Sequence, residues 1–111
     1  MDLRLASKLW IDARRRLVER RGGYFTVIRG GHDIAGAIQI VFRRRDGHFD
    51  LAVPSPDGAG EEGDRVFNWA GRDLSPEALD AHIAREVRFD PDFWLIECEG
   101  APDLPSVFGL E

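Results

Sequence analysis

Apolar side chains recur with two spacings along this chain, and each spacing predicts a different kind of element. Residues 5–21 carry apolar residues four positions apart, which is the spacing of one helix face. The predicted core-facing stripe of this helix consists of Leu5, Leu9, Trp10, Ala13 and Leu17. Gly22 and Gly23 follow the stripe, and they predict the helix end because glycine readily takes the positive φ found there.

Shorter stretches alternate apolar and polar residues, or combine aromatic with β-branched side chains, as strands do. The predicted strands cover residues 24–29, 35–43, 49–53, 66–69 and 93–99. Asp46 and Gly47, between the second and third strands, are a strong hairpin signal because this pair suits a tight turn. We expect the first three strands to form an antiparallel meander with one buried face.

A second helix is predicted to begin after Ser75. Ser75 is a favoured N-cap residue, Pro76 suits the first helical position, and the acidic Glu77 suits the first turn. The apolar face of this helix consists of Leu79, Ile83 and Val87, with Ala78 and Ala84 alongside. We expect the helix to end near Phe89, because Pro91 disfavours helical geometry in the residue before it.

The order of these elements, α-β-β-β-β-α-β, predicts an α+β fold. We expect residues 1–111 to form one small domain, with a mainly antiparallel sheet of four or five strands and two helices packed on one face. Residues 54–64 contain Pro, Gly and acidic residues and predict an exposed acidic loop. Residues 100–111 predict an irregular tail that mixes Pro and Gly with apolar side chains.

The segment from residue 85 to residue 99 reads Arg-Glu-Val-Arg-Phe-Asp-Pro-Asp-Phe-Trp-Leu-Ile-Glu-Cys-Glu. This run resembles the signature of a short bacterial family known as domain of unknown function 1491, in which a helix ends in Arg-Phe-Asp-Pro-Asp-aromatic and leads into a strand with alternating acids. The Gly-Ala-Ile strand start at 36–38, the Asp-Gly hairpin and the chain length are also similar to that family. The resemblance implies a shared fold and a bacterial, cytoplasmic setting, and it implies no particular activity.

Composition narrows the class of protein. With 43% hydrophobic and 32% charged residues among 111, the chain is typical of a folded globular domain. Its single cysteine, Cys98, excludes an internal disulfide and fits a reducing compartment. No apolar run approaches the roughly 20 residues of a transmembrane helix, and the first residues lack the pattern of a signal peptide. We therefore expect a cytoplasmic protein that does not associate with membranes.

Charge is unevenly distributed along the chain, although the net charge is only −5. Residues 1–50 contain 11 basic and 6 acidic side chains, whereas residues 51–111 contain 4 and 14. This split is compatible with a nucleic-acid surface, with two complementary faces that meet, or with ordinary uneven surface charge. The candidate anion-binding residues are Arg14, Arg15, Arg16, Arg43, Arg44 and Arg45. Binding of nucleic acid or phosphate through them is our alternative hypothesis, because charge runs are more often solvated or ion-paired.

Two glycine motifs are better explained as turns or loops than as ligand sites. Residues 58–63 match the letters of the dinucleotide fingerprint G-x-G-x-x-G, but no apolar helix follows and the flanking acids would repel a phosphate. The Arg-Gly-Gly units at 21–23 and 29–31 lie at the two ends of a predicted strand, where glycine serves turns.

The remaining reactive side chains show no spacing that indicates catalysis or metal binding. The residues considered were His32, His48, His82, Cys98, Asp90 and Asp92. Cys98 alternates with apolar neighbours, which predicts burial. The two aspartates flank Pro91 and are expected to satisfy turn backbone groups and to pair with Arg85 and Arg88. We therefore expect no catalytic residues, metal ligands or cofactor.

Apolar side chains outnumber the places where one sheet face and two helices could bury them. Most large aromatics, Phe89 included, are expected in the core. The candidate partner-binding residues are Trp69, Leu104, Val107, Phe108 and Leu110. A leftover apolar patch usually marks an interface. We therefore predict a non-catalytic module that binds another protein or forms a homodimer, through the open sheet face or an exchanged tail.

Overall fold

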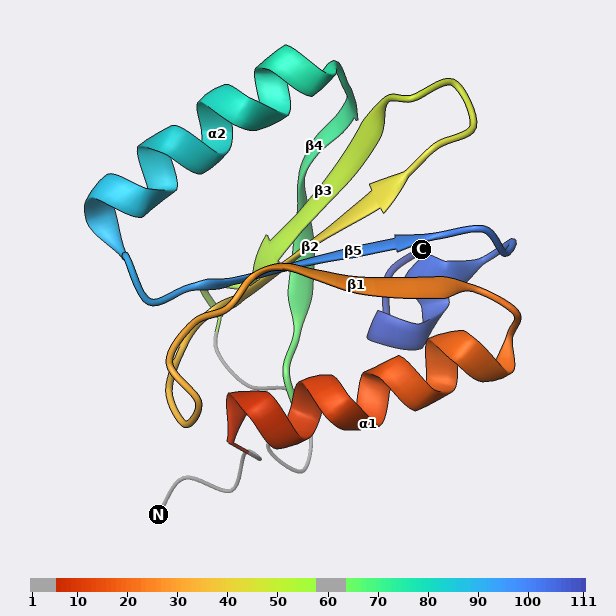
Figure 1. The fold of residues 1–111 in the computed structure, drawn as a ribbon, viewed down its shortest axis with the longest axis horizontal. Helices are drawn as coiled ribbons and strands as arrows, with labels where there is room; N and C mark the ends of the chain where they lie inside the picture. Colours follow the sequence, from red (N-terminus) through yellow and green to blue (C-terminus); the bar gives the residue numbers. More distant parts are fainter. Residues whose placement is uncertain (1–5, 58–63) are drawn as a thin grey trace.

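Two α-helices and five strands follow one another in the predicted order (Figure 1). The computed structural model describes residues 6–57 and 64–111. Its elements are α1 (Ser7–Arg20), β1 (Tyr24–Arg29), β2 (Ile38–Arg43), β3 (Phe49–Pro54), β4 (Phe67–Leu74), α2 (Pro76–Phe89), β5 (Trp94–Glu99) and a short 3-10 helix, η2 (Leu104–Phe108). The glycine motif at 58–63 and part of the predicted 54–64 loop lie outside the described residues. The predicted α+β class and element order are confirmed.

Local sequence signals account for the start of α2 and the end of α1. The Ser75 hydroxyl oxygen accepts a hydrogen bond from the Ala78 N–H at 3.1 Å, and Pro76 begins α2 as predicted. Gly22 follows α1 with a φ of 84°, the left-handed conformation expected of it. At the start of α1, the Ser7 hydroxyl donates to the Gly36 carbonyl at 2.6 Å, so this helix begins against the loop before β2.

The strands form one sheet in the order β1-β5-β2-β3-β4. Three of the pairings are antiparallel, and β5 runs parallel to β2. The predicted mainly antiparallel sheet is therefore confirmed, but the expected pairing of β1 with β2 is wrong because β5 lies between them. β5 is buried on both faces through Trp94, Leu95 and Ile96, which suits a central strand better than an edge.

The two helices cover opposite faces of the sheet, which corrects the expectation that both would share one face (Figure 1). Trp10, Ile11 and Val18 of α1 pack in one core, with Ile40 of β2. The second core contains Leu79 of α2. The sheet residues packed in the same core are Val41, Phe49, Leu51 and Leu95. Successive strand residues point to opposite faces, so neighbours such as residues 40 and 41 belong to different cores. The physical reason lies in β2, which buries five consecutive residues and therefore needs cover on both sides.

The face of α1 that is buried differs from the predicted leucine stripe. Leu9 is 60% exposed and Leu17 is 37% exposed, whereas Trp10, Ile11 and Val18 are buried. Arg14 lies on this buried side with its guanidinium 5.0 Å from the centre of the Trp10 ring. A pattern that counts arginine only as polar misses this face, because the aliphatic stem of arginine can cover apolar surface. Leu5 lies outside the described residues.

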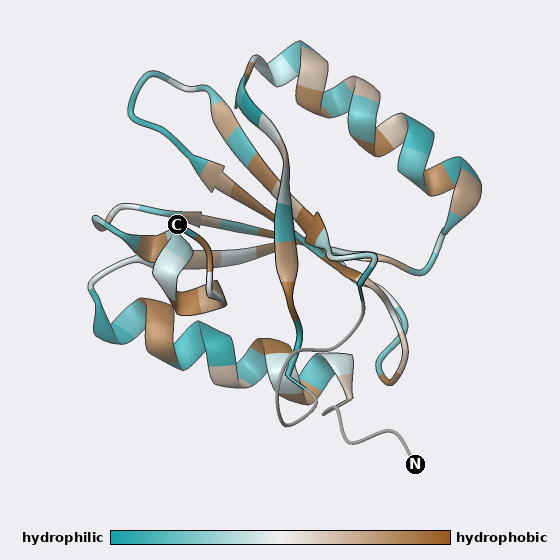
Figure 2. Ribbon diagram, turned by 180° about the vertical axis from the view of Figure 1, so that it is seen from behind, coloured by the Kyte–Doolittle hydropathy of each residue, from teal (hydrophilic) through white to brown (hydrophobic). Residues whose placement is uncertain are grey.

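The apolar face of α2 is as predicted, with one exception at its end. Leu79 is buried, and Ile83 and Val87 pack partly buried against the same core. Phe89, the last residue of the helix, is 85% exposed, so its predicted place in the core is wrong. In Figure 2 both helices show apolar positions among hydrophilic ones, as expected for helices with one buried face.

The tail after β5 folds back onto the core that contains α1. Leu104, Val107, Phe108 and Leu110 are all buried there within the same chain. The Arg21 guanidinium holds the tail by donating to the Ser106 hydroxyl at 2.7 Å and to the Asp103 carbonyl at 3.2 Å. Among the described residues, neither α-helix is long and apolar enough to cross a membrane.

Candidate functional site

The α1 arginines are engaged with neighbouring side chains. Arg14 forms an ion pair with Asp64 at 3.0 Å, in addition to its contact with the Trp10 ring. The Arg15 guanidinium lies 5.3 Å from the centre of the Phe25 ring. Arg16 is exposed. Of these three predicted anion-binding residues, two are therefore already stacked or paired within the chain.

The hairpin arginines lie far from α1, because the β2–β3 hairpin points away from that helix (Figure 1). Arg43 lies 4.0 Å from the Glu97 carboxylate and stacks over Phe49. Arg44 contacts three acids, and Arg45 is exposed. The two arginine groups thus form no single basic surface, so phosphate binding through all six together stays a prediction without geometric support.

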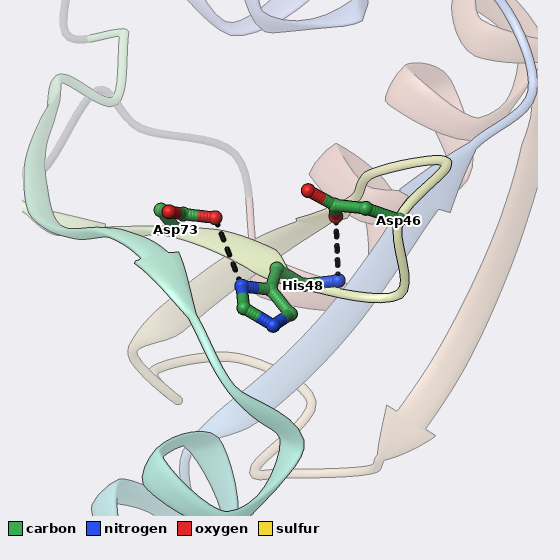
Figure 3. A group of neighbouring side chains, drawn as sticks. All are labelled: Asp46, His48 and Asp73. Carbon is green, nitrogen blue, oxygen red and sulfur yellow. Dashed lines mark hydrogen bonds and ion pairs between the residues drawn. The ribbon is translucent and has the colours of Figure 1, made fainter.

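Asp46, His48 and Asp73 come together at the tip of this hairpin (Figure 3). Nδ1 of His48 lies 2.9 Å from Oδ1 of Asp73, and the carboxylate of Asp46 accepts the His48 backbone N–H at 2.9 Å. This backbone hydrogen bond, helped by nearby Arg44, lowers the pKa of Asp46. An imidazole and two carboxylates within 4.8 Å are a ligand set that a divalent cation accepts.

An arginine already forms ion pairs with both carboxylates of that cluster. The Arg44 guanidinium lies 3.6 Å from Asp73 and 3.8 Å from Asp46, and it also approaches Asp50 at 3.6 Å. Arg72 pairs with the same Asp50 at 3.3 Å. A cation bound here would face repulsion from these guanidinium groups. The contacts describe an ion-pair network that joins the hairpin tip to the end of β4, and the sequence spacing of its members does not reveal it.

A cavity of about 380 Å³ lies between α1, the start of β4 and η2. The Asp64 carboxylate at its rim accepts hydrogen bonds from the Trp10 indole at 3.2 Å and from Arg14. Burial raises the pKa of Asp64, but hydrogen bonds from Arg65, Trp10 and Arg14 outweigh it and lower the pKa overall. Two predicted partner-binding residues, Val107 and Phe108, form an apolar wall of this cavity.

The other predicted partner-binding residues also lie in the core. Trp69 is partly buried, its ring packs edge-on against Phe42 at 5.5 Å, and its indole donates to the Glu111 carbonyl at 3.1 Å. Leu104 and Leu110 are buried with the rest of the tail. These side chains stabilise their own chain in this structure, and an exchange of the tail between two copies stays a prediction.

The buried reactive groups are engaged in structure. Cys98 is fully buried, as predicted, and this burial raises the pKa of its thiol to about 12, which keeps the thiol protonated at neutral pH. Nε2 of His82 lies 2.8 Å from Oε1 of buried Gln39, which pins α2 to β2. Burial lowers the pKa of His82 despite nearby Glu86.

The corner between α2 and β5 matches the prediction only in its backbone contacts. The Asp90 carboxylate accepts the Asp92 N–H at 3.0 Å, as expected for a turn around a proline. Asp90 and Asp92 do not form the expected ion pairs with Arg85 and Arg88, and all four residues lie in the described part of the chain. Instead, Arg29 donates to the Pro91 carbonyl from the end of β1.

An exposed surface remains beside α2, where β1 forms the sheet edge. Tyr24, Thr26 and Ile28 point to the α2 side of β1 and are exposed, Tyr24 to 68% and Ile28 to 50%. Next to Ile28, a groove of about 190 Å³ runs between β5 and the first half of α2. Its lining consists of Ile28, Val41, Phe49, Pro76, Leu79, Asp80, Ile83, Leu95 and Glu97. We call β1 and this groove the β1 edge surface.

The two edges of the sheet differ in how well they are protected against pairing with another strand. β4 carries Arg72 and Asp73 at its end, Asp73 has a φ of 56°, and its register with β3 shifts twice. Bulges and charges of this kind discourage a further strand. β1 has one irregularity, at Ile28 near its end, and consists of aromatic and β-branched residues up to Arg29. β1 is therefore the more receptive edge.

Comparison with known proteins decides the family. A family model described as "Protein of unknown function (DUF1491)" matches residues 5–105. The chain belongs to the DUF1491 family. The predicted resemblance is confirmed, although four of the five predicted partner-binding residues are buried in the core of this DUF1491 fold.

Solved structures share the DUF1491 fold along nearly the whole chain. A protein from A. tumefaciens, determined in solution, is 31% identical, covers 96% of this chain and 94% of its own, and superposes with a TM-score of 0.84. A crystal structure of a DUF1491 protein from Caulobacter crescentus is 31% identical over 86% of each chain, with a TM-score of 0.70. We found no match among curated proteins.

The β1 edge surface of this DUF1491 domain was not among the sites predicted from the sequence. One signal for it was present, because Tyr24 and Ile28 alternate with residues of the opposite face on a predicted strand. What the sequence could not reveal is that β1 lies at an edge and that α2 stops short of covering it. That information resides in the strand order.

Proposed function

We propose that this DUF1491 domain is a non-catalytic protein-binding module that takes up an extended segment of a partner protein along β1. The observation that carries the proposal is the combination of an unprotected edge strand with exposed apolar side chains and an adjacent groove. In an antiparallel pair, every second residue of an edge strand directs its N–H and C=O away from the sheet. An added strand binds these groups, and its side chains enter neighbouring pockets.

Two buried reactive side chains are held in structural roles, which favours binding over chemistry at those positions. The Cys98 thiol is buried with a pKa of about 12, and the His82 ring is held by Gln39. Neither group is placed as an activated nucleophile or base. The proposal places the domain in the cytoplasm, in keeping with the reduced cysteine.

The test is a selection of random displayed peptides about 10 residues long, roughly the upper length of a single strand. Peptides selected on the purified domain are measured against Ile28→Lys, which puts a charge on the exposed rim of the groove. Leu9→Lys is the matched control, because Leu9 is similarly exposed but lies on α1. We expect Ile28→Lys to weaken binding at least about tenfold and Leu9→Lys to leave it within about twofold.

Two results would overturn the proposal. One is a selection whose binders tolerate Ile28→Lys as well as they tolerate Leu9→Lys. The other is a dimer, seen by light scattering at micromolar concentration, that Ile28→Lys dissociates, because a second copy would then be the occupant of β1.

Nucleic-acid or phosphate binding is the alternative. Of the six arginines predicted for it, all within the described residues, Arg16 and Arg45 are exposed and have no described partner. Its test is retention on heparin at low salt, which should fall steeply as salt rises if phosphate-like contacts matter. Loss of that retention in an Arg16→Ala, Arg45→Ala double variant would favour this alternative over the β1 proposal.

A further inference from the structure

The groove beside β1 combines apolar walls with carboxylates. A purely apolar side chain of a partner would offer these carboxylates no hydrogen-bond donor. Leu79, Ile83 and Leu95 form part of the walls, whereas Glu97 and Asp80 supply negative charge. The Glu97 side chain is only 15% exposed, so its carboxylate is partly removed from water. A half-buried carboxylate gains from a cation placed against it.

Arg43 is the cation already near Glu97, and its ion pair with this carboxylate is long. The Arg43 guanidinium lies 4.0 Å from the Glu97 carboxylate, at the limit of an ion pair, and is itself 46% exposed and stacked on Phe49. Burial raises the pKa of Glu97, and Arg43 only partly offsets that effect. The carboxylate thus retains unmet capacity for a donor from the open side of the groove, where β1 lies.

The register of β1 with β5 leaves a path to Glu97 from outside the sheet. Thr26 lies directly opposite Glu97 in the ladder, between the larger side chains of Tyr24 and Ile28. A strand added to β1 would lie about 10 Å from β5, twice the usual strand spacing. A long side chain opposite the short Thr26 can cross that distance, whereas Tyr24 covers the neighbouring position, opposite Glu99.

We propose that the partner segment binds with a Lys or Arg side chain that crosses Thr26, lays its aliphatic stem along the groove and pairs its charge with Glu97. This inference rests on the proposed function and adds to it the chemistry of the partner. The fit follows from the amphipathic shape of these side chains, since the stem suits the apolar wall and the charged end suits Glu97 and Asp80. The occupant is an extended segment with a basic residue on the side that faces α2.

The test uses the displayed peptides and a double-mutant cycle. We expect the selected peptides to be enriched in Lys or Arg at one fixed position. Replacement of that residue by norleucine, which keeps the stem and removes the charge, should weaken binding to the wild-type domain about tenfold. The same replacement should cost less than about twofold in Glu97→Gln, and Glu99→Gln serves as the matched control because Tyr24 lies opposite Glu99.

The outcomes separate this inference from the proposed function. Two outcomes would overturn the basic-residue inference and leave the binding module intact. In the first, the selected peptides depend on Ile28 but show no enriched basic position. In the second, the norleucine replacement weakens binding to Glu97→Gln as much as it weakens binding to the wild-type domain. Binders that ignore Ile28 overturn both. A second readout is the carboxyl ¹³C titration of Glu97, whose pKa should fall when a basic peptide binds and stay unchanged with its norleucine analogue.

Discussion

Replacement of Phe108 by alanine tests the central role that the structure gives to the tail. Phe108 is 5% exposed, and its ring lies 5.7 Å from that of Phe42, 6.0 Å from Trp10 and 6.4 Å from Phe67, measured between ring centres. The tail therefore contributes a side chain to the middle of an aromatic cluster that spans α1, β2 and β4. Its removal would leave a cavity among rigid rings that cannot easily collapse.

The expected cost follows from burial and cavity formation. Buried Phe→Ala substitutions lower the free energy of unfolding by about 3–5 kcal/mol. A small domain has a total of only about 5–15 kcal/mol, so the variant should be folded but close to its limit. Phe89→Ala is a matched control with the same chemical change, since Phe89 is 85% exposed and its loss should alter stability by no more than about 0.5 kcal/mol.

Urea unfolding followed by tryptophan fluorescence measures both variants. With a urea m-value of about 1–3 kcal/mol/M, the midpoint of Phe108→Ala should fall by at least about 1 M, and that of Phe89→Ala should barely move. A loss below about 1 kcal/mol in Phe108→Ala, or equal losses in both variants, would refute the packing described here. A midpoint that rises with protein concentration would indicate instead that the tail docks on another copy.

Further predictions concern the loop after β1, the titration of His82 and Glu97, and the Cys98 thiol. Gly31→Ala should lower stability by about 1–3 kcal/mol or more in urea unfolding, because a Cβ there would lie 2.2 Å from the Asp92 carbonyl oxygen; an unchanged midpoint would contradict this approach. Since the folded pKa of His82 is lowered, the stability it contributes is present above about pH 6.5 and is lost as the pH falls through its folded pKa, and His82→Gln should flatten that part of the pH profile. The folded pKa of Glu97 is raised, so its effect has the opposite sign. The contribution of Glu97 to the free energy of unfolding is most favourable below pH 4.5 and falls as the pH rises through the folded pKa, and Glu97→Gln should remove this slope. Cys98 should react with a thiol reagent only as fast as the chain opens, and rapid labelling of the native protein would contradict its burial.

The binding proposal concerns a surface that the Phe108 and Gly31 variants leave untouched. Ile28 and Thr26 are exposed on β1, and Glu97 faces the groove from the neighbouring strand. Changes there should alter affinity much more than stability, whereas changes at Phe108 or Gly31 should do the reverse. This separation allows loss of binding to be distinguished from loss of fold.

The sequence by itself determined the order and type of the elements, because those depend on residues close together in the chain. Ser75, Pro76 and the spacing of Leu79, Ile83 and Val87 were enough to predict α2. Gly22 and the Asp46–Gly47 pair marked a helix end and a hairpin for the same reason. The run from residue 85 to residue 99 was also enough to indicate the family.

Only the tertiary structure decided which strands pair, which face each helix covers and which side chains meet. The insertion of β5 between β1 and β2 depends on contacts between residues more than fifty positions apart, and loop closure distinguishes only weakly between such pairings. That single choice buried β2 and β5 on both faces and made β1 an edge. A separate tertiary pairing, that of β4 with β3, brought Asp73 to His48. The candidate binding surface exists because of strand order, a property of the whole fold rather than of any local segment.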